Sequence, residues 1–359
     1  MEPFVVRSLL DPGGSGDLES MLTLGSGELR DSICQYLPTK DVCTLRLANN
    51  ACHKTISNYR WKLNQPFCLY ENEDISKWKI SFPNAKSVHF MKNNITDAGL
   101  IHLTGIHTLY ISNCQGITNA GLVHLRGIHT LNISKFSGIT DAGLVHLRDI
   151  HTLNISKCQG ITDAGLVHLR GIHTLNISKC QGITDAGLTH LSGIHTLDIS
   201  NCQGITDAGL VHLSGIHTLN ISDCESITDD GLVHLSNIHT LNISECNNIT
   251  DAGLMYLNNV HTLDISKCDN ITDAGLMYLN NVHILDITRC TNITYAGLLQ
   301  LTNIKMVKIS LCMKIKLNMI DKLNYTIVNC GCITCKIIAC GCKSNPPCCT
   351  NQRYQPYNW

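Results

Sequence analysis

The sequence has little of what marks several large classes of protein. Aromatic residues make up only 5% of its 359 residues, and its formal net charge is -1. A core built on large rings is therefore not expected, and no global electric field would draw the chain to nucleic acid or to an acidic membrane. No apolar stretch approaches the roughly 18 residues that a membrane-spanning helix needs. We expect neither a nucleic-acid partner nor a membrane partner.

The N-terminus also lacks the pattern of a secretory signal, because no positively charged segment leads into an apolar run after Met1. Twenty cysteines would suggest a disulfide framework in a short secreted chain. Without a secretory signal they favour a reducing compartment, and we expect the cytoplasm. The Asn-, Ile- and Lys-rich composition suits the AT-rich genome of a protist or a large DNA virus. In the viral case the compartment would be the host cytoplasm.

What the sequence does contain is a repeat of 22 residues, present about ten times. Each repeat opens with Ile or Val, at Ile106, Ile128, Ile150, Ile172, Ile194, Ile216, Ile238, Val260, Val282 and Ile304. An earlier copy begins near Ala85 and is one residue shorter. About eleven repeats therefore cover residues 85–325.

The pattern inside one repeat predicts a short strand, a turn and a short helical return. Leu175 and Ile177 alternate with polar residues, as in a half-buried strand. Thr184 and Asp185, which follow the turn, are both good helix N-cap residues. One repeat alone could not bury its apolar side chains, whereas stacked repeats bury them against the same positions of their neighbours.

The spacing of Ile172, Leu175, Ile177 and Cys180 is L-x-x-L-x-L-x-x-C and resembles the leucine-rich repeat. It is similar to the subtype in which Cys replaces the usual Asn. This resemblance implies an α/β fold, a leucine-rich-repeat solenoid, in which short parallel strands stack with short helical returns. Repeats of that subtype usually run a few residues longer, so the helices here should be short or partly 3₁₀.

Cysteine and histidine recur at fixed positions. Nine repeats carry a ladder cysteine, at Cys114, Cys158, Cys180, Cys202, Cys224, Cys246, Cys268, Cys290 and Cys312. One histidine row contains His107, His129, His151, His173, His195, His217, His239, His261 and His283. The other contains His102, His124, His146, His168, His190, His212 and His234, continued by Tyr256 and Tyr278. Such rows could bind metal or sense pH. Rows at one-strand spacing lack the tetrahedral convergence that zinc requires. We therefore expect buried packing for the thiols, solvent-facing ladders for the histidines, and no metal or cofactor.

Strand residues that face away from the core form the usual binding surface of such an array. Its Thr and Ser columns hardly vary, whereas one column varies in charge. We predict that a protein target contacts Tyr110, Asn113, Lys135, Lys157, Lys179, Asp223, Glu245, Lys267 and Arg289. The column could select a partner of complementary charge. The alternative is ordinary variation among duplicated repeats.

The N-terminal segment differs from the repeats. We expect disorder over residues 1–20 and a small helical module over 21–64, in which Leu29, Ile33 and Leu37 have helical spacing and Pro38 ends the helix. This module resembles an F-box, which docks onto a Skp-type adaptor protein of cullin ubiquitin ligases. The resemblance implies adaptor contacts at Leu29, Ile33, Leu37, Pro38, Val42 and Leu45. The alternative is a helical cap that only shields the first repeat.

Two segments remain. Residues 65–84 are expected to supply a linker and an N-terminal cap with the first capping strands, and residues 326–359 a Cys-rich C-terminal cap and tail. In that tail Cys332 and Cys335 have zinc-ligand spacing, although lipidation or plain thiols would equally explain its cysteines.

The F-box resemblance and the repeats together imply a scaffold that holds a protein target for a cullin-type ubiquitin ligase. A stand-alone leucine-rich-repeat binding protein is the alternative. We do not expect an enzyme, because little chain remains outside the repeats for a catalytic domain.

Overall fold

The computed structural model describes residues 72–81, 83–91, 95–112, 115–312, 314–315, 323 and 326–328. The chain divides into two compact units after Ile150, and each is considered by itself. The segment expected to be disordered at 1–20, the helical module expected at 21–64 and most of the tail expected at 326–359 lie outside the described residues.

Both compact units alternate short strands with short helices. The first contains α6 (Asn72–Ser81), β1 (Ser87–Met91), α7 (Asp97–Leu100), η1 (Ile101–Leu103), β2 (Thr108–Ser112), α8 (Asn119–Leu122), η2 (Val123–Leu125), β3 (Thr130–Asn132), α9 (Asp141–Leu144) and η3 (Val145–Leu147). The second begins with β4 (Thr152–Asn154), α10 (Asp163–Leu166), η4 (Val167–Leu169), β5 (Thr174–Asn176), α11 (Asp185–Leu188), β6 (Thr196–Asp198), α12 (Asp207–Leu210), η5 (Val211–Leu213), β7 (Thr218–Asn220), α13 (Asp229–Leu232) and η6 (Val233–Leu235). It continues with β8 (Thr240–Asn242), α14 (Asp251–Leu254), β9 (Thr262–Asp264), α15 (Asp273–Leu276), β10 (Ile284–Asp286), α16 (Tyr295–Leu298), β11 (Met306–Lys308) and β12 (Thr326–Val328).

The short helical returns are those expected, since α7 to α16 each span four residues and several continue into a 3₁₀ turn, labelled η. None of the helices in the described part of the chain has the length and hydropathy needed to cross a bilayer.

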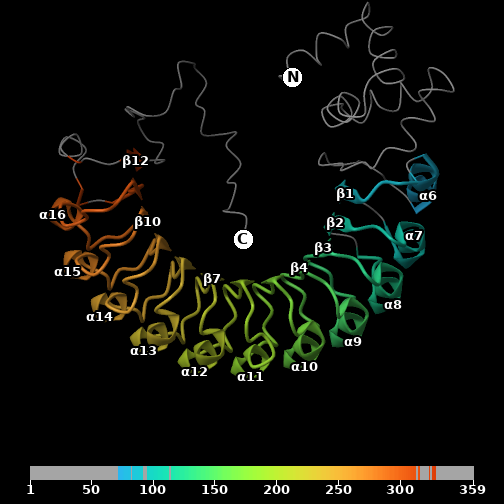
Figure 1. Ribbon diagram of the computed structural model, residues 1–359, viewed down its shortest axis with the longest axis horizontal. Helices are drawn as coiled ribbons and strands as arrows, with labels where there is room; N and C mark the ends of the chain where they lie inside the picture. The colour runs from blue at the N-terminus through green and yellow to red at the C-terminus, as the bar shows by residue number, and fades with distance from the viewer. Residues whose placement is uncertain are drawn as a thin grey trace, which may run out of the picture. The chain divides into compact units, whose positions relative to one another are not determined.

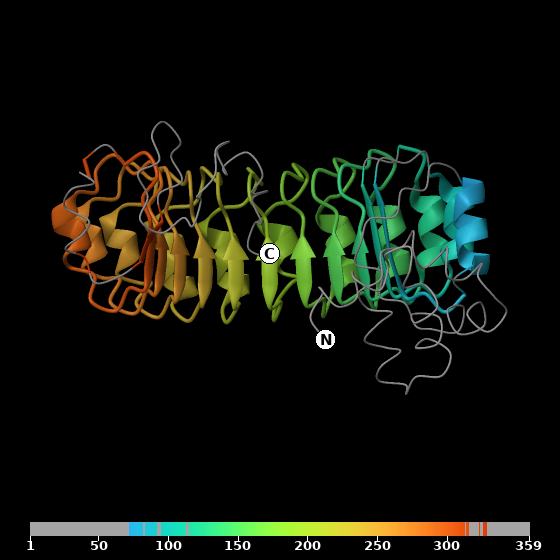
Figure 2. The same cartoon turned by 90° about the horizontal axis from the view of Figure 1, so that it is seen from above.

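Within each compact unit, consecutive strands lie side by side in parallel, β1 to β3 in the first and β4 to β12 in the second (Figure 2). From β4 to β10 the paired residues are 22 positions apart, so that Leu175 pairs with Leu197. Thr pairs with Thr from β4 to β9, and Thr262 of β9 pairs with Ile284 of β10. Val88 pairs with Leu109, a step of 21, which confirms that the first repeat is one residue shorter. In the second compact unit the helices cover one face of the strands and leave the other open (Figure 1).

The core is a set of columns that run from repeat to repeat. In the repeat from Ile172 the buried positions are Leu175, Ile177, Ile183, Leu188 and Leu191, each at most 1% exposed. Equivalent residues are buried in the other described repeats. This arrangement confirms the prediction that each repeat buries its apolar side chains against its neighbours.

The ladder cysteines pack as small apolar groups with a weak hydrogen bond. The Cys180 Sγ donates to the backbone oxygen of Ile155 in the preceding repeat at 3.4 Å, and Cys246 bonds to Ile221 in the same way at 3.1 Å. Burial raises the pKa of the Cys180 thiol to about 12. Burial therefore favours the protonated form of these thiols, which agrees with the packing interpretation.

In the described part of the segment 65–84, residues 72–81 form a helix where capping strands were expected. In α6, Ile75 and Trp78 lie one helical turn apart and are both buried. The Trp78 ring packs edge-on against Phe90 of β1, with 6.4 Å between ring centroids. The helix therefore shields the apolar end of the first repeat.

A hydrogen-bond chain joins each helix start to the next repeat. The hydroxyl of Thr206 caps α12 by accepting from Ala208 N at 3.2 Å. The Asp185 carboxylate of the preceding repeat accepts from Thr206 N at 2.8 Å and from its hydroxyl at 2.6 Å. Of the two expected N-cap residues, Thr is the cap and Asp binds the following repeat instead.

A close contact explains the glycine that follows in each helix. A Cβ atom on buried Gly209 would collide with the Asp185 carboxylate and lie 3.0 Å from Leu188 Cδ1. Glycine at this position is thus required by the inter-repeat hydrogen bonds and not by an unusual backbone conformation.

Gly209→Ala should therefore destabilise the protein, although Gly→Ala inside a helix ordinarily stabilises it by about 0.5–1 kcal/mol. Displacing the Asp185 carboxylate should lower the free energy of unfolding by about 1–3 kcal/mol. Urea unfolding of the full chain measures this, with Ala208→Ser at the adjacent exposed position as the control. A stabilised Gly209→Ala protein would contradict the argument.

Candidate functional site

The strands of the second compact unit leave one face open (Figure 1). Two rows of polar residues lie along these strands, and a third row lies in the turns that follow them. The first is the Thr row, Thr152, Thr174, Thr196, Thr218, Thr240 and Thr262. The second is called the amide row after its asparagines, although it also includes aspartates. Its members are Asn154, Asn176, Asp198, Asn220, Asn242, Asp264 and Asp286. The third is the turn row, Lys157, Lys179, Asn201, Asp223, Glu245, Lys267, Arg289 and Leu311.

The amide row holds the turns in place. Asn176 Oδ1 accepts from the backbone N of Ser178 at 3.0 Å, and its Nδ2 donates to Asp198 Oδ2 at 2.9 Å. Burial raises the pKa of Asp198, although hydrogen bonds from Ser200, Asn220 and Asn176 oppose that rise. A side-chain oxygen that binds the backbone two residues on is a common way to fix a turn. The amide row is therefore mainly structural.

The turn row lies just beyond the strands and not on them, which corrects the position expected from the sequence. The polar alternation of a strand such as β4 ends at Asn154, and Lys157 follows in a turn whose backbone N donates to Ser178 O at 2.8 Å. Every member of the turn row has a left-handed backbone, for example a φ of 61° at Lys179 and 64° at Arg289.

A left-handed backbone costs a residue with a Cβ roughly 1–2 kcal/mol, and Gly, or less often Asn or Asp, is the usual occupant. Asn201 and Asp223 in the turn row are of that kind. The other repeats keep Lys, Arg, Glu or Leu there. The backbone strain is therefore located in the turn row, which is also the row whose charge varies most.

The charges in the turn row are not all free to meet a partner. Lys267 and Glu245 form an ion pair at 2.5 Å, and Asn201 donates to the Asp223 carboxylate. In the described part of the chain, the exposed side chains of Lys179 and Arg289 form no ion pair. These two exposed cations can meet a partner without first breaking an ion pair.

The other predicted contacts lie in the first compact unit or outside the described residues. Tyr110 on β2 is 37% exposed, with its ring centroid 5.5 Å from that of His89. Lys135 is exposed and has the same left-handed backbone, with a φ of 68°. Asn113 lies outside the described residues.

One histidine row forms a stacked ladder just before the strands, as predicted. The rings of His173 and His195 stack with 4.5 Å between centroids and 14° between planes. From His107 to His261 each Nδ1 lies beside a threonine hydroxyl, as in His173 and Thr174 at 3.1 Å, whereas His283 Nδ1 lies 2.9 Å from the Asn281 backbone oxygen. Parallel rings do not point their nitrogen atoms at a common centre. Within the described ranges no group of three or more His, Cys, Asp or Glu side chains is placed to hold a metal ion.

Two features of the site were missed by sequence reasoning. The inter-repeat role of Asp185 had a signal in the near-constant Thr-Asp-Ala-Gly segment of the repeats. The left-handed conformation of the turn row had no sequence signal, because charged residues rather than Gly occupy it.

Comparison with known proteins identifies the repeats. Six segments match a family model described as Leucine Rich repeat, at residues 146–169, 170–192, 194–214, 216–236, 234–257 and 256–280. The chain therefore contains leucine-rich repeats, and its fold is a leucine-rich-repeat solenoid. Repeats of this kind serve as scaffolds for protein–protein interaction. No curated protein sequence matches the chain.

Two solved structures are similar in fold. Rad7, in the crystal structure of the Rad7 and Elc1 complex in yeast, aligns with a TM-score of 0.61 and 14% identity over 90% of this chain and 96% of that one. An internalin (inlF) from Listeria monocytogenes aligns with a TM-score of 0.51 and 22% identity over 64% of this chain and 68% of that one. At these identities the likeness concerns the fold.

The histidine ladder predicts that stability falls in mild acid. Burial first, and then neighbouring imidazoles, lower the pKa values of His173, His195, His217 and His261. A lowered pKa means that the unfolded chain takes up protons first. Stability is therefore full above the unfolded pKa, about 6.5, and declines as the pH falls below it. Urea unfolding between about pH 7.5 and pH 5.5 measures this decline.

His195→Gln should reduce that decline, whereas Gln at the exposed neighbour Ser192 should leave it unchanged. If the free energy of unfolding does not change across this pH range, the histidine ladder does not couple stability to pH.

The turn row predicts a gain in stability on removing its side chains. Lys179→Gly should raise the free energy of unfolding by about 0.5–1 kcal/mol, because glycine relieves the left-handed strain but has a larger unfolded-state entropy. Lys179→Asn should give a smaller gain. Chemical denaturation of the three proteins gives the order, and a loss of stability with glycine would show that the strain argument is wrong.

Proposed function

We propose that the protein holds a target protein against the turn row and presents it to a cullin-type ubiquitin ligase through a Skp-type adaptor. The observation that supports target binding is the turn row itself. Its charged side chains occupy backbone positions that glycine would fit at lower free energy. Strained residues that persist through a fold are frequently functional.

The charges suggest how a target would be selected. Lys179 and Arg289 are exposed cations, while Asp223 and Glu245 lie between them along the row. Exposed charges at an interface set partner choice and association rate more than affinity. The Thr row, nearly constant along the strands, gives the target a uniform polar surface beside this varied one.

The adaptor role is proposed for residues 21–64, where Leu29, Ile33, Leu37, Pro38, Val42 and Leu45 supply the apolar contacts. The N-terminal helix α6 supports it over the alternative of a simple cap. Ile75 and Trp78 of α6 already cover the first repeat, so the solenoid does not need residues 21–64 as a shield. Rad7, which shares the fold over most of its length, is in a complex with a second protein, Elc1.

In this role the protein performs no chemistry. It raises the effective concentration of a target lysine near a ubiquitin carrier, as any linked pair of binding modules does. The proposed place of action is the cytoplasm, or the host cytoplasm for a viral protein.

Co-purification of the full chain with a Skp-type adaptor tests the proposal. Leu37→Asp should abolish adaptor retention, because a charged group would enter the apolar contact, whereas Leu37→Ile should retain it. Lys179→Glu in the turn row is the matched control, and it should keep the adaptor. Thermal unfolding of each variant establishes that the repeats are intact.

If the folded wild-type chain does not retain the adaptor, or if Leu37→Asp retains it fully, the ligase role fails. The protein would then be a leucine-rich-repeat binding protein that acts without an adaptor.

A further inference from the structure

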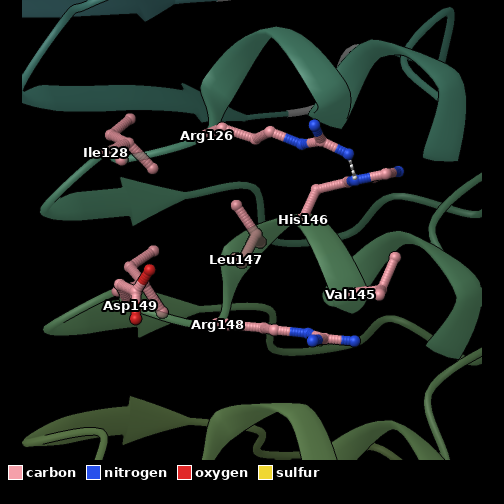
Figure 3. A pocket seen from close by; sticks show the side chains of 9 residues that line it. Arg126, Ile128, Val145, His146, Leu147, Arg148 and Asp149 are labelled. Atoms are coloured by element: carbon pink, nitrogen blue, oxygen red, sulfur yellow. Dashed lines mark hydrogen bonds between the residues drawn. The ribbon is translucent and has the colours of Figure 1, made fainter.

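A hollow lies in the first compact unit, between the loop that leads into β3 and the loop that follows η3. It is lined by Arg126, Gly127, Ile128, Val145, His146, Leu147, Arg148, Asp149 and Ile150 (Figure 3). It shares no residue with the turn row, and none of its lining residues belongs to the predicted target or adaptor contacts.

The two loops beside the hollow differ in backbone conformation. Gly127 has a φ of 77°, and the preceding Arg126 has an extended ψ of 132°. In the next repeat Asp149 replaces the glycine, and Arg148 takes a helical ψ of -33°. The hollow therefore lies between two neighbouring loops that are not copies of one another.

The rim of the hollow is cationic. Arg126 Nη2 donates to His146 Nδ1 at 3.1 Å, which holds the guanidinium in place. If Nδ1 accepts this bond, the remaining proton of the neutral ring is on Nε2, a further donor. The exposed Arg148 side chain extends to the same side as Arg126 and His146 (Figure 3). In the described part of the chain neither arginine forms an ion pair.

The remaining lining residues do not cancel this charge. Figure 3 shows Asp149 on the side of the hollow away from the two guanidinium groups. The buried floor is apolar and consists of Ile128, Leu147 and Ile150, each at most 4% exposed. An apolar floor lowers the local dielectric and strengthens the attraction between the rim and an anion.

We propose that this hollow binds a phosphate group between Arg126 and Arg148, with His146 as a third donor. Guanidinium is planar and presents paired N–H donors that match phosphate oxygens. Two such groups on adjacent repeats balance the charge of a phosphate dianion. The phosphate could be free in solution or carried as a monoester on a serine side chain.

Calorimetric titration of the full chain with inorganic phosphate and with O-phosphoserine, at constant ionic strength, tests the proposal. Saturable binding is expected, weakened about tenfold or more by Arg126→Ala and by Arg148→Ala, since each removes charged hydrogen bonds. Arg148→Lys should recover part of the loss, because it restores the charge without the paired donors.

Arg170→Ala is the matched control. Arg170 contacts His190 at 3.3 Å, as Arg126 contacts His146, but it does not line the hollow. Its loss should leave phosphate binding unchanged. Tighter binding of O-phosphoserine would identify a phosphorylated side chain as the ligand, and tighter binding of inorganic phosphate would identify the free ion.

Two results would overturn the proposal. One is the absence of saturable binding of either probe to the folded full chain. The other is an equal loss of binding in Arg170→Ala and Arg148→Ala, since general electrostatic attraction would then account for it.

Discussion

The carboxylate of Asp185 binds both the backbone and the hydroxyl of Thr206, the residue that starts the next helix. The same contact recurs along the described repeats, with the cysteine hydrogen bonds and the leucine columns beside it. All three link a repeat to its immediate neighbour. Stability in such an array is a sum of nearest-neighbour terms, and a repeat with no neighbour would expose its apolar side chains. Trp78 of α6 supplies the missing neighbour at the N-terminal end.

This coupling determines which positions are free to vary. Leu175, Cys180, Asp185 and Gly187 each contact an adjacent repeat, so a change at any of them disturbs two repeats at once. The side chain of Lys179 points out of a turn whose hydrogen bonds are made by its backbone. Its identity is therefore not fixed by the stacking, and charge can change there from one repeat to the next without loss of the fold.

The same logic explains what the sequence could and could not predict. The period placed the strands, the short helices and the buried cysteines correctly, because a core position that recurs every 22 residues must meet its own copy. Two errors came from local rules. Asp185 was expected as a helix cap, but the cap preference does not distinguish Thr from Asp. Lys179 was expected on a strand, because a left-handed turn is usually recognised by a glycine and this position holds a lysine. The helical pattern of Ile75 and Trp78 was present but was not recognised.

Both candidate binding surfaces lie at positions where the residues differ from one repeat to the next. The turn row varies because stacking uses only its backbone atoms, and the hollow near Arg148 lies where Asp149 replaces the glycine of the preceding repeat. A perfectly regular array would present the same surface at every repeat and could not discriminate among partners. Specificity in this fold therefore depends on residues that differ between repeats. Such differences do not disturb stacking when they occur at exposed positions outside the inter-repeat contacts.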